Sequence, residues 1–242
     1  MRYGEEREVV EQRVAVVTAG GRGMGGAIAR ALAARDYALV LMSPGGSAEA
    51  LAEELGGIGV KGSVTQPKDL EALVGAAMDA YGRIDAVANN TGFPPKGPLL
   101  DIPDEDWHAG LDMVLLNVVR MTRLVTPTMV AQGGGAIVNI STYAAVEPTP
   151  AYPVSATLRA GLSTFTKLYT DEYSASGIRM NNILPGFIDT HGKDDTVAKD
   201  IPARRYGTPE EIGETAAFLL SDGAGYITGQ NLRVDGGLTR SI

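Results

Sequence analysis

Short apolar runs alternate along the chain with longer segments in which apolar residues recur every three to four positions. The first run covers residues 14–18, and in the segment after it Met24, Ile28 and Leu32 fall on one helical face. The remaining runs predict strands at residues 38–42, 58–61, 84–89, 136–140, 178–184 and 232–234. The remaining periodic segments predict helices at residues 47–55, 67–81, 107–131, 153–176 and 209–221. Strands that alternate with helices indicate a parallel sheet, because parallel neighbours need a crossover connection.

This order predicts an α/β fold, a single-domain doubly wound parallel sheet of about seven strands with helices on both faces. A chain of 242 residues fits one such domain. The charged residues 1–12 are expected to form an N-terminal extension, and residues 13–242 the domain. Sheets of this kind bind ligands beyond the carboxyl ends of their strands, so a site is expected at the strand–helix turns.

Charge and composition narrow the choice of partners. The net charge of −8 comes from interspersed acids and bases, which leaves no basic face for nucleic acid. The chain has no cysteine, which excludes a thiolate nucleophile and fits the cytoplasm. No run of eighteen apolar residues occurs, and His108 and His191 lack metal-ligand spacing. We therefore expect a cytoplasmic protein that binds a small molecule, with no nucleic-acid, membrane or metal partner.

A glycine-rich turn joins the first predicted strand to the first predicted helix, at residues 18–25, T-A-G-G-R-G-M-G. Glycines let the backbone approach a pyrophosphate, and the start of the helix supplies free N–H groups and the positive end of its dipole. A glycine-rich turn alone can serve tight packing, but its position after the first strand of a β-α-β pattern is typical of dinucleotide binding. The predicted cofactor contacts in this turn are Thr18, Gly20, Arg22, Gly23, Met24 and Gly25.

Several motifs resemble those of the short-chain dehydrogenase/reductase family. The turn is similar to that family's T-G-x-x-x-G-x-G, with Ala19 in place of the first glycine, and N-N-T-G at residues 89–92 is similar to its N-N-A-G. Residues 178–186 are similar to the family segment that contacts the nicotinamide. The resemblance runs from about residue 13 to residue 237 and implies a Rossmann-type fold, a nicotinamide cofactor and a homodimer or homotetramer. The further cofactor contacts that it implies are Asn90, Thr91, Gly92, Pro185, Gly186, Ile188 and Thr190.

The end of the second predicted strand bears on the choice between NAD and NADP. An acid there would accept hydrogen bonds from the adenosine ribose of NAD. This chain has Ser43 instead, followed by Pro44 and Gly45, so no carboxylate repels a 2′-phosphate. Arg22 can offer that phosphate a bidentate contact, although a solvated loop side chain is the alternative. We therefore predict NADP as the cofactor in preference to NAD.

The family's chemistry depends on a Tyr that donates a proton, a Lys four residues later that binds ribose, a Ser thirteen residues before the Tyr, and an Asn on an earlier helix. Residues 162–172 match the family's helix only when Arg159 takes the Lys position. The Tyr position is then Ser155, and the Ser position is Thr142, which directly follows the strand segment where the family Ser belongs. The match of residues 162–172 and the place of Thr142 therefore indicate the same alignment with the family.

The fourth family position is also replaced in this register. Counting seven residues from Trp107 places Val114 where the family has its Asn. Asn117 lies one turn later and is a weak substitute. The resemblance therefore implies a member of the family in which all four usual catalytic residues are absent.

These replacements predict an altered route for the proton. Thr142 keeps a hydroxyl, and Arg159 keeps a charge that can still bind the cofactor ribose, although a guanidinium is not equivalent to an ammonium. Ser155 is the serious change, because an aliphatic hydroxyl is too weak an acid near neutral pH. Tyr152 is the first candidate to take over and Tyr143 the second; for either one, the alternative is a partly buried aromatic. The predicted catalytic residues are thus Thr142, Ser155, Arg159 and Tyr152.

Three functions fit these residues. The leading prediction is an NADP-dependent oxidoreductase that acts on a small carbonyl, alcohol or imine substrate through an altered proton-delivery site. The second is a non-catalytic NAD(P)-binding protein of the same fold, because the Tyr and Lys are replaced. The third is a lyase or isomerase that uses the bound cofactor transiently. The sequence does not identify the substrate.

Overall fold

The computed structural model describes residues 12–190 and 195–241, so the predicted extension lies outside the described residues except for Gln12. Seven parallel strands form one sheet in the order β3-β2-β1-β4-β5-β6-β7. The strands are β1 (Val14–Thr18), β2 (Ala38–Ser43), β3 (Ile58–Lys61), β4 (Ala86–Asn89), β5 (Gly135–Ile140), β6 (Ile178–Pro185) and β7 (Asn231–Val234). The predicted doubly wound fold is confirmed. Because the strand order reverses between β1 and β4, the turns after these two strands border a crevice.

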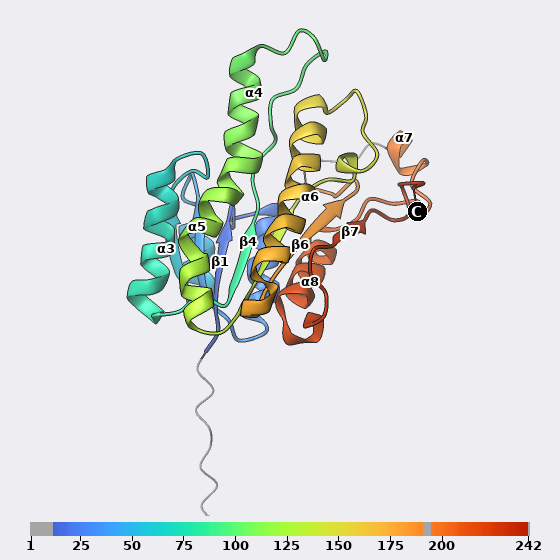
Figure 1. Cartoon of the computed structure of the whole chain (residues 1–242). Helices are drawn as coiled ribbons and strands as arrows, with labels where there is room; N and C mark the ends of the chain where they lie inside the picture. The colour runs from blue at the N-terminus through green and yellow to red at the C-terminus, as the bar shows by residue number, and fades with distance from the viewer. Residues whose placement is uncertain (1–11, 191–194, 242) are drawn as a thin grey trace, which may run out of the picture.

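Two layers of helices cover the sheet (Figure 1). Ala15 and Val17 of β1 face one buried apolar cluster, and Val14 and Val16 face another, as the alternation of side chains along a strand requires. The first cluster packs under α1 (Gly23–Ala33), α2 (Ser47–Leu55) and α8 (Pro209–Leu220). The second packs under α3 (Pro67–Tyr81), α5 (Asn117–Ala131) and α6 (Pro153–Tyr173). The short helix α7 (Asp195–Ala198) follows β6.

The helix predicted at residues 107–131 differs from the observed one. It begins earlier, with α4 (Asp104–Leu111), and the carboxylates in its first turn complement the helix dipole. It then passes through a π-helical turn, Asp112–Leu116, before α5. An ion pair between Arg120 and Asp112, 2.6 Å long, spans this turn. Apolar periodicity cannot reveal such a local change in winding, and turns of this type recur at functional sites.

The stretch Asp104–Ala131 also has an unusual composition. Within the described residues it is the one helical stretch long and apolar enough, by those two measures alone, to cross a membrane. In this protein 44% of the most apolar 18-residue segment of this stretch is buried. Its residues Met121, Val125 and Met129 belong to the second apolar cluster. A core helix meets the same two measures, so this stretch carries no argument for a membrane partner.

Candidate cofactor and active site

The glycine-rich turn after β1 has no room for side chains at two positions. A Cβ on Gly25 would overlap the carbonyl oxygen of Ala19 and lie 2.8 Å from Nδ2 of Asn90. A Cβ on Gly21 would lie 2.6 Å from the backbone nitrogen of Ala48 at the start of α2. Ala19 itself has a φ of +44°, the conformation that favours the glycine found there in the family motif. The turn is therefore packed tightly against both α2 and the turn after β4.

The start of α1 fits a bound anion. The helix begins at Gly23, no side chain caps it, and its first turn holds no acidic residue. The amide groups of this turn are therefore free of side-chain partners, and the positive end of the helix dipole faces the crevice. Thr190 lies close by, since its Cγ2 would be 3.6 Å from a Cβ on Gly23. The predicted pyrophosphate and nicotinamide segments therefore lie side by side.

Thr18 and Asn90 connect the turns after β1 and β4. The Thr18 hydroxyl donates to the Asn90 carbonyl at 2.7 Å, and the Asn90 backbone N–H donates to Thr18 Oγ1 at 2.9 Å. The next hydroxyl, Oγ1 of Thr91, is buried and has no partner in the described structure. A buried hydroxyl beside a free helix start suits a polar ligand, so these residues fit a dinucleotide.

Ser43 lies where the adenosine end of the cofactor is predicted. Its hydroxyl is 3.0 Å from that of Ser47 and accepts a hydrogen bond from the Ala48 N–H at 2.9 Å. No carboxylate ends β2, as the sequence predicted. Lys61, a residue the sequence interpretation missed, lies beside Ser43 in the pairing of β2 with β3. Its place at the end of β3 is the signal that identifies it, because strand ends meet at one edge of a parallel sheet.

The predicted catalytic positions lie near the carboxyl end of β5. Thr142 directly precedes a 3₁₀ turn at Tyr143–Ala145 and accepts a long, 3.4 Å hydrogen bond from the Ala144 N–H. Ser155 is half-buried in the first turn of α6. The hydroxyl of Ser141, which the sequence interpretation passed over, is buried without a partner in the described structure. The structure therefore brings several hydroxyls to one end of the sheet.

Arg159 has an environment that the sequence did not suggest. It is buried, and its Nη1 donates a hydrogen bond to the carbonyl of Ile140, the last residue of β5. Burial away from water lowers the pKa of this guanidinium to about 10. The contact between Arg159 and a cofactor ribose remains a prediction.

The position predicted for the family Asn, Val114, lies within the π-helical turn. Val114 is buried there, so an apolar side chain occupies the predicted site of the amide. Asn117 is buried as well, and its Nδ2 donates to the Met113 carbonyl at 3.1 Å. Its Oδ1 has no partner in the described structure, which leaves one buried acceptor near the turn.

Tyr152 is the residue before α6, with φ −138° and ψ 55°, so the prediction that Pro153 forces it out of helical geometry is confirmed. The cation beside its ring is Lys96, whose Nζ lies 4.7 Å from the ring centroid. Tyr143 lies in the 3₁₀ turn after β5, and burial first, then the nearby Tyr152 and Glu147, raise the pKa of its phenol.

Four asparagines form a row beneath the site. Asn89, Asn139, Asn182 and Asn231 are paired in register across β4, β5, β6 and β7. Each side-chain amide donates to the next along this row, at 2.8–2.9 Å. Thr166 of α6 also donates to Asn182. This chain of hydrogen bonds, buried except at Asn231, fixes the ends of the four strands relative to one another, and only the sheet register reveals it.

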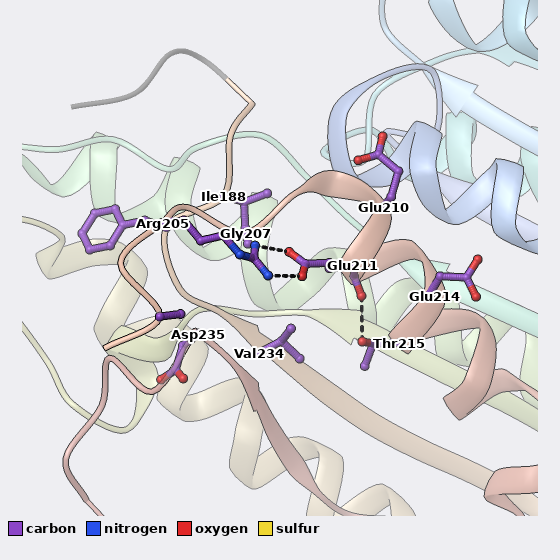
Figure 2. A pocket seen from close by; sticks show the side chains of 12 residues that line it. Ile188, Arg205, Gly207, Glu210, Glu211, Glu214, Thr215, Val234 and Asp235 are labelled. Carbon is purple, nitrogen blue, oxygen red and sulfur yellow. Dashed lines mark hydrogen bonds and ion pairs between the residues drawn. The ribbon is translucent and has the colours of Figure 1, made fainter. Parts of the chain in front are cut away.

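A hollow of about 500 Å³ lies between the segment after β6 and the start of α8 (Figure 2). Ile188 lines it, but the glycine-rich turn, Thr142 and Ser155 do not. Arg205 forms two contacts with Glu211, at 2.8 and 2.6 Å, across one wall. That guanidinium, together with the Thr208 N–H, lowers the pKa of Glu211 to about 2. The hollow therefore borders the predicted nicotinamide segment but is not the predicted site itself.

Comparison with known proteins gives a consistent result. The family profile described as enoyl-(acyl carrier protein) reductase matches residues 18–239. A 3-oxoacyl-(acyl-carrier-protein) reductase of Synechocystis is 36% identical over 238 residues, which are 93% of this chain and 96% of the relative. The oxidoreductase UcpA of Salmonella typhimurium is 35% identical, with 94% of each chain covered.

Solved structures agree with these relatives. L-sorbose reductase of Gluconobacter frateurii, in complex with NADPH and L-sorbose, has a TM-score of 0.89 and 29% identity, with 96% of this chain and 98% of that chain covered. The fold, the glycine-rich turn and these relatives lead to one conclusion: the chain belongs to the short-chain dehydrogenase/reductase family, whose members use NAD or NADP.

Proposed function

We propose that the protein is an NADP-dependent oxidoreductase that interconverts a small carbonyl or imine compound and its reduced form. The observation that carries this proposal is the packing around Gly25, where the turn after β1, the turn after β4 and the uncapped start of α1 meet. A glycine-rich turn at a free helix start, after the first strand of a β-α-β unit, is typical of dinucleotide binding. The L-sorbose reductase complex with NADPH supports the same choice of cofactor.

The protein's own groups have separate roles in this proposal. The amides at the start of α1, with Gly20 and Gly23, hold the pyrophosphate, and Asn90 and Thr91 line the path toward the reacting end. Pro185, Gly186, Ile188 and Thr190 flank the nicotinamide, which supplies or accepts a hydride when bound. Thr142 and Ser155 orient the substrate oxygen or nitrogen. A phenol at the mouth of the site delivers the proton.

Tyr152 is the proposed proton donor. Ser155 is a poor acid because it is an aliphatic hydroxyl. Tyr143 is less suitable because burial raises the pKa of its phenol, so that it holds its proton more firmly than an ordinary tyrosine. Tyr152 lies half-buried at the start of α6, in the chain turn that leads to Ser155, with Lys96 against its ring. The proton therefore passes from the Tyr152 hydroxyl to the substrate, and water replaces it.

Consumption of NADPH with a panel of ketones and preformed imines tests the proposed function. Imines belong in the panel because they can enter already protonated, which lessens the need for an acid. We expect at least one class to turn over in proportion to enzyme concentration. NADPH binding without turnover of any compound would instead favour a non-catalytic protein.

One observation favours that second candidate. Arg159, at the predicted Lys position, is buried, and its Nη1 donates to the Ile140 carbonyl. Its guanidinium therefore helps to hold α6 against β5. A protein that has lost its chemistry while retaining its fold would keep such a contact. The same substrate panel separates the two functions.

The adenosine end of the site leads to a prediction about cofactor choice. We expect NADPH to bind more tightly than NADH, because Arg22 can form charge-assisted hydrogen bonds with a 2′-phosphate and no acid lies at Ser43. Such bonds contribute ~1.5–3 kcal/mol, so Arg22→Ala should reduce the preference about tenfold or more in calorimetric titrations. Ser43→Asp should move the preference toward NADH.

The matched control is Arg30→Ala, an exposed arginine of α1 that pairs with Glu54 and lies beyond the turn. It should leave both affinities unchanged. Equal or tighter binding of NADH by the unaltered protein would refute the assignment of NADP.

Exposed apolar side chains lead to a prediction about assembly. Leu168 of α6, Phe218 of α8 and Leu232 of the edge strand β7 are all exposed in the single chain. We expect a homodimer or homotetramer that covers them, because single chains seldom leave an edge strand and apolar helix faces open. Light scattering at micromolar concentration should give two or four times the chain mass of 25.3 kDa. A strictly monomeric mass would contradict this prediction.

A further inference from the structure

Aromatic side chains gather at the carboxyl ends of β4, β5 and β6. The chain is poor in aromatics, with four Phe, nine Tyr and one Trp. Five of them come from separate turns beside the predicted substrate site, and we call this group the aromatic wall. Its members are Phe93 after β4, Tyr143 after β5, Tyr152 before α6, Phe187 after β6 and Tyr206 before α8.

Ring contacts connect three members of the wall, Tyr143, Phe187 and Tyr206. The rings of Tyr143 and Phe187 have centroids 5.7 Å apart, and those of Phe187 and Tyr206 are 5.9 Å apart, with the second pair edge-on. Tyr152 lies near enough to Tyr143 to affect its ionisation. Tyr143 directly follows Thr142, and Phe187 directly follows Gly186 of the predicted nicotinamide segment. The wall therefore borders the place where the substrate is expected to react.

Lys96 adds a positive charge to one end of the wall. Its Nζ lies 4.7 Å from the centroid of Tyr152 and 5.5 Å from that of Phe93. No carboxylate pairs with Lys96 within residues 12–190 and 195–241, and the side chain is exposed. Prolines at 94, 95 and 98 stiffen its loop. In a chain of net charge −8, this ammonium is held at the rings and remains available to an anion.

We infer that the aromatic wall and Lys96 bind the non-reacting part of the substrate and select a flat, unsaturated carbonyl or imine compound that carries a carboxylate or similar anion. Aromatic faces gain most from planar apolar surface, and an ammonium beside them discriminates in favour of negative charge. The inference rests on the proposed function for the identity of the reacting group. It goes beyond that function in naming the class of substrate.

Three probes separate the contributions of ring and charge. These are 4-acetylbenzoate, its neutral methyl ester, and 4-oxopentanoate, which has the charge without the ring. We expect the full-length protein, saturated with NADP⁺, to bind 4-acetylbenzoate at least about tenfold more tightly than either of the others in calorimetric titrations. Absence of binding by 4-acetylbenzoate, or an equal affinity for the ester, would overturn the inference.

Variants assign the discrimination to individual residues. Lys96→Met should weaken binding of 4-acetylbenzoate about tenfold and leave the ester unchanged. Phe93→Ala should weaken both. Lys68→Met, which removes the same charge from an exposed position on α3, should change neither. Equal effects of the Lys96 and Lys68 variants would also overturn the inference.

Binding and turnover distinguish failure of the anion site from failure of the proposed function. Selective binding of 4-acetylbenzoate without NADPH consumption by any carbonyl or imine would refute the proposed oxidoreductase while the anion site stands. Turnover across the panel with no preference for flat anionic compounds, together with equal binding of acid and ester, would refute this inference alone.

Discussion

Tyr152→Phe is expected to reduce turnover by ~10²–10⁴-fold, the usual contribution of a general acid. The change removes the hydroxyl that the proposed mechanism uses as the proton donor and keeps the ring that Lys96 contacts. Binding of NADPH should therefore stay the same, so the loss should appear in kcat rather than in cofactor affinity. Steady-state rates on the best compound of the panel, with parallel calorimetry, measure both quantities.

Two controls make this result specific. Tyr143→Phe removes a neighbouring phenol of the same wall and should have a small effect, because burial raises the pKa of that phenol above its ordinary value. Ser155→Ala should cost much less than Tyr152→Phe if Ser155 only orients the substrate. Full activity of Tyr152→Phe on a substrate that truly turns over would show that the proton comes from elsewhere.

A complementary variant tests the register behind this mechanism. Ser155→Tyr combined with Arg159→Lys introduces the two residue types that the predicted register expects at these positions. Gain of ordinary ketone reduction by the double variant would support the predicted register of α6, on which the four predicted replacements depend. Arg159 also holds the Ile140 carbonyl, so the melting temperature of the double variant must be measured beside its activity.

Gly25→Ala is expected to weaken binding of NADPH by about a hundredfold or more, which corresponds to ~2.7 kcal/mol. The new Cβ would overlap the Ala19 carbonyl oxygen, so the turn that is proposed to receive the pyrophosphate must shift. Overpacking of this kind costs ~1–3 kcal/mol of stability, so the variant should still fold with a lower melting temperature. Calorimetric titration and thermal unfolding of the same samples separate the two effects.

The neighbouring glycine supplies the control. A Cβ on Gly26 would lie 3.5 Å from its nearest neighbours, Gly21 and Leu51, which is ordinary van der Waals contact. Gly26→Ala should therefore bind NADPH as the unaltered protein does and be slightly more stable, because alanine favours a helix. Equal affinities for the Gly25 and Gly26 variants would refute the assignment of this turn to the pyrophosphate.

Much of the fold could be predicted from the sequence because its strands and helices have strong and different periodicities. The runs at residues 14–18 and 58–61 match β1 and β3, and the segment at residues 67–81 matches α3. The π-helical turn at Asp112–Leu116 could not be predicted, because its apolar residues continue the pattern of the flanking helices. The pair between Arg120 and Asp112, which spans this turn, joins residues eight apart and leaves no periodic signal in the sequence.

The site was predictable where a motif is local in sequence. The turn at residues 18–25 and the N-N-T-G motif that contains Asn90 are each short, continuous sequence motifs. The structure joins them through hydrogen bonds between Thr18 and Asn90. The row of asparagines and the aromatic wall were not predictable, because their members lie on different strands and turns that only the sheet register brings together. The burial of Arg159 was missed for a related reason. Its position on α6 could be predicted, but the carbonyl of β5 that it contacts could not.

The central claim is that the protein transfers a hydride from NADPH and that Tyr152 supplies the proton. Transfer of deuterium from NADPH labelled at C4 tests this claim most directly. Mass spectrometry of the product should show one deuterium gained with the unaltered protein and with Ser155→Ala, and very little with Tyr152→Phe in the same time. That pattern would show hydride transfer whose proton depends on Tyr152. Tight binding of NADPH with no deuterium in the product of any ketone or imine would contradict the account.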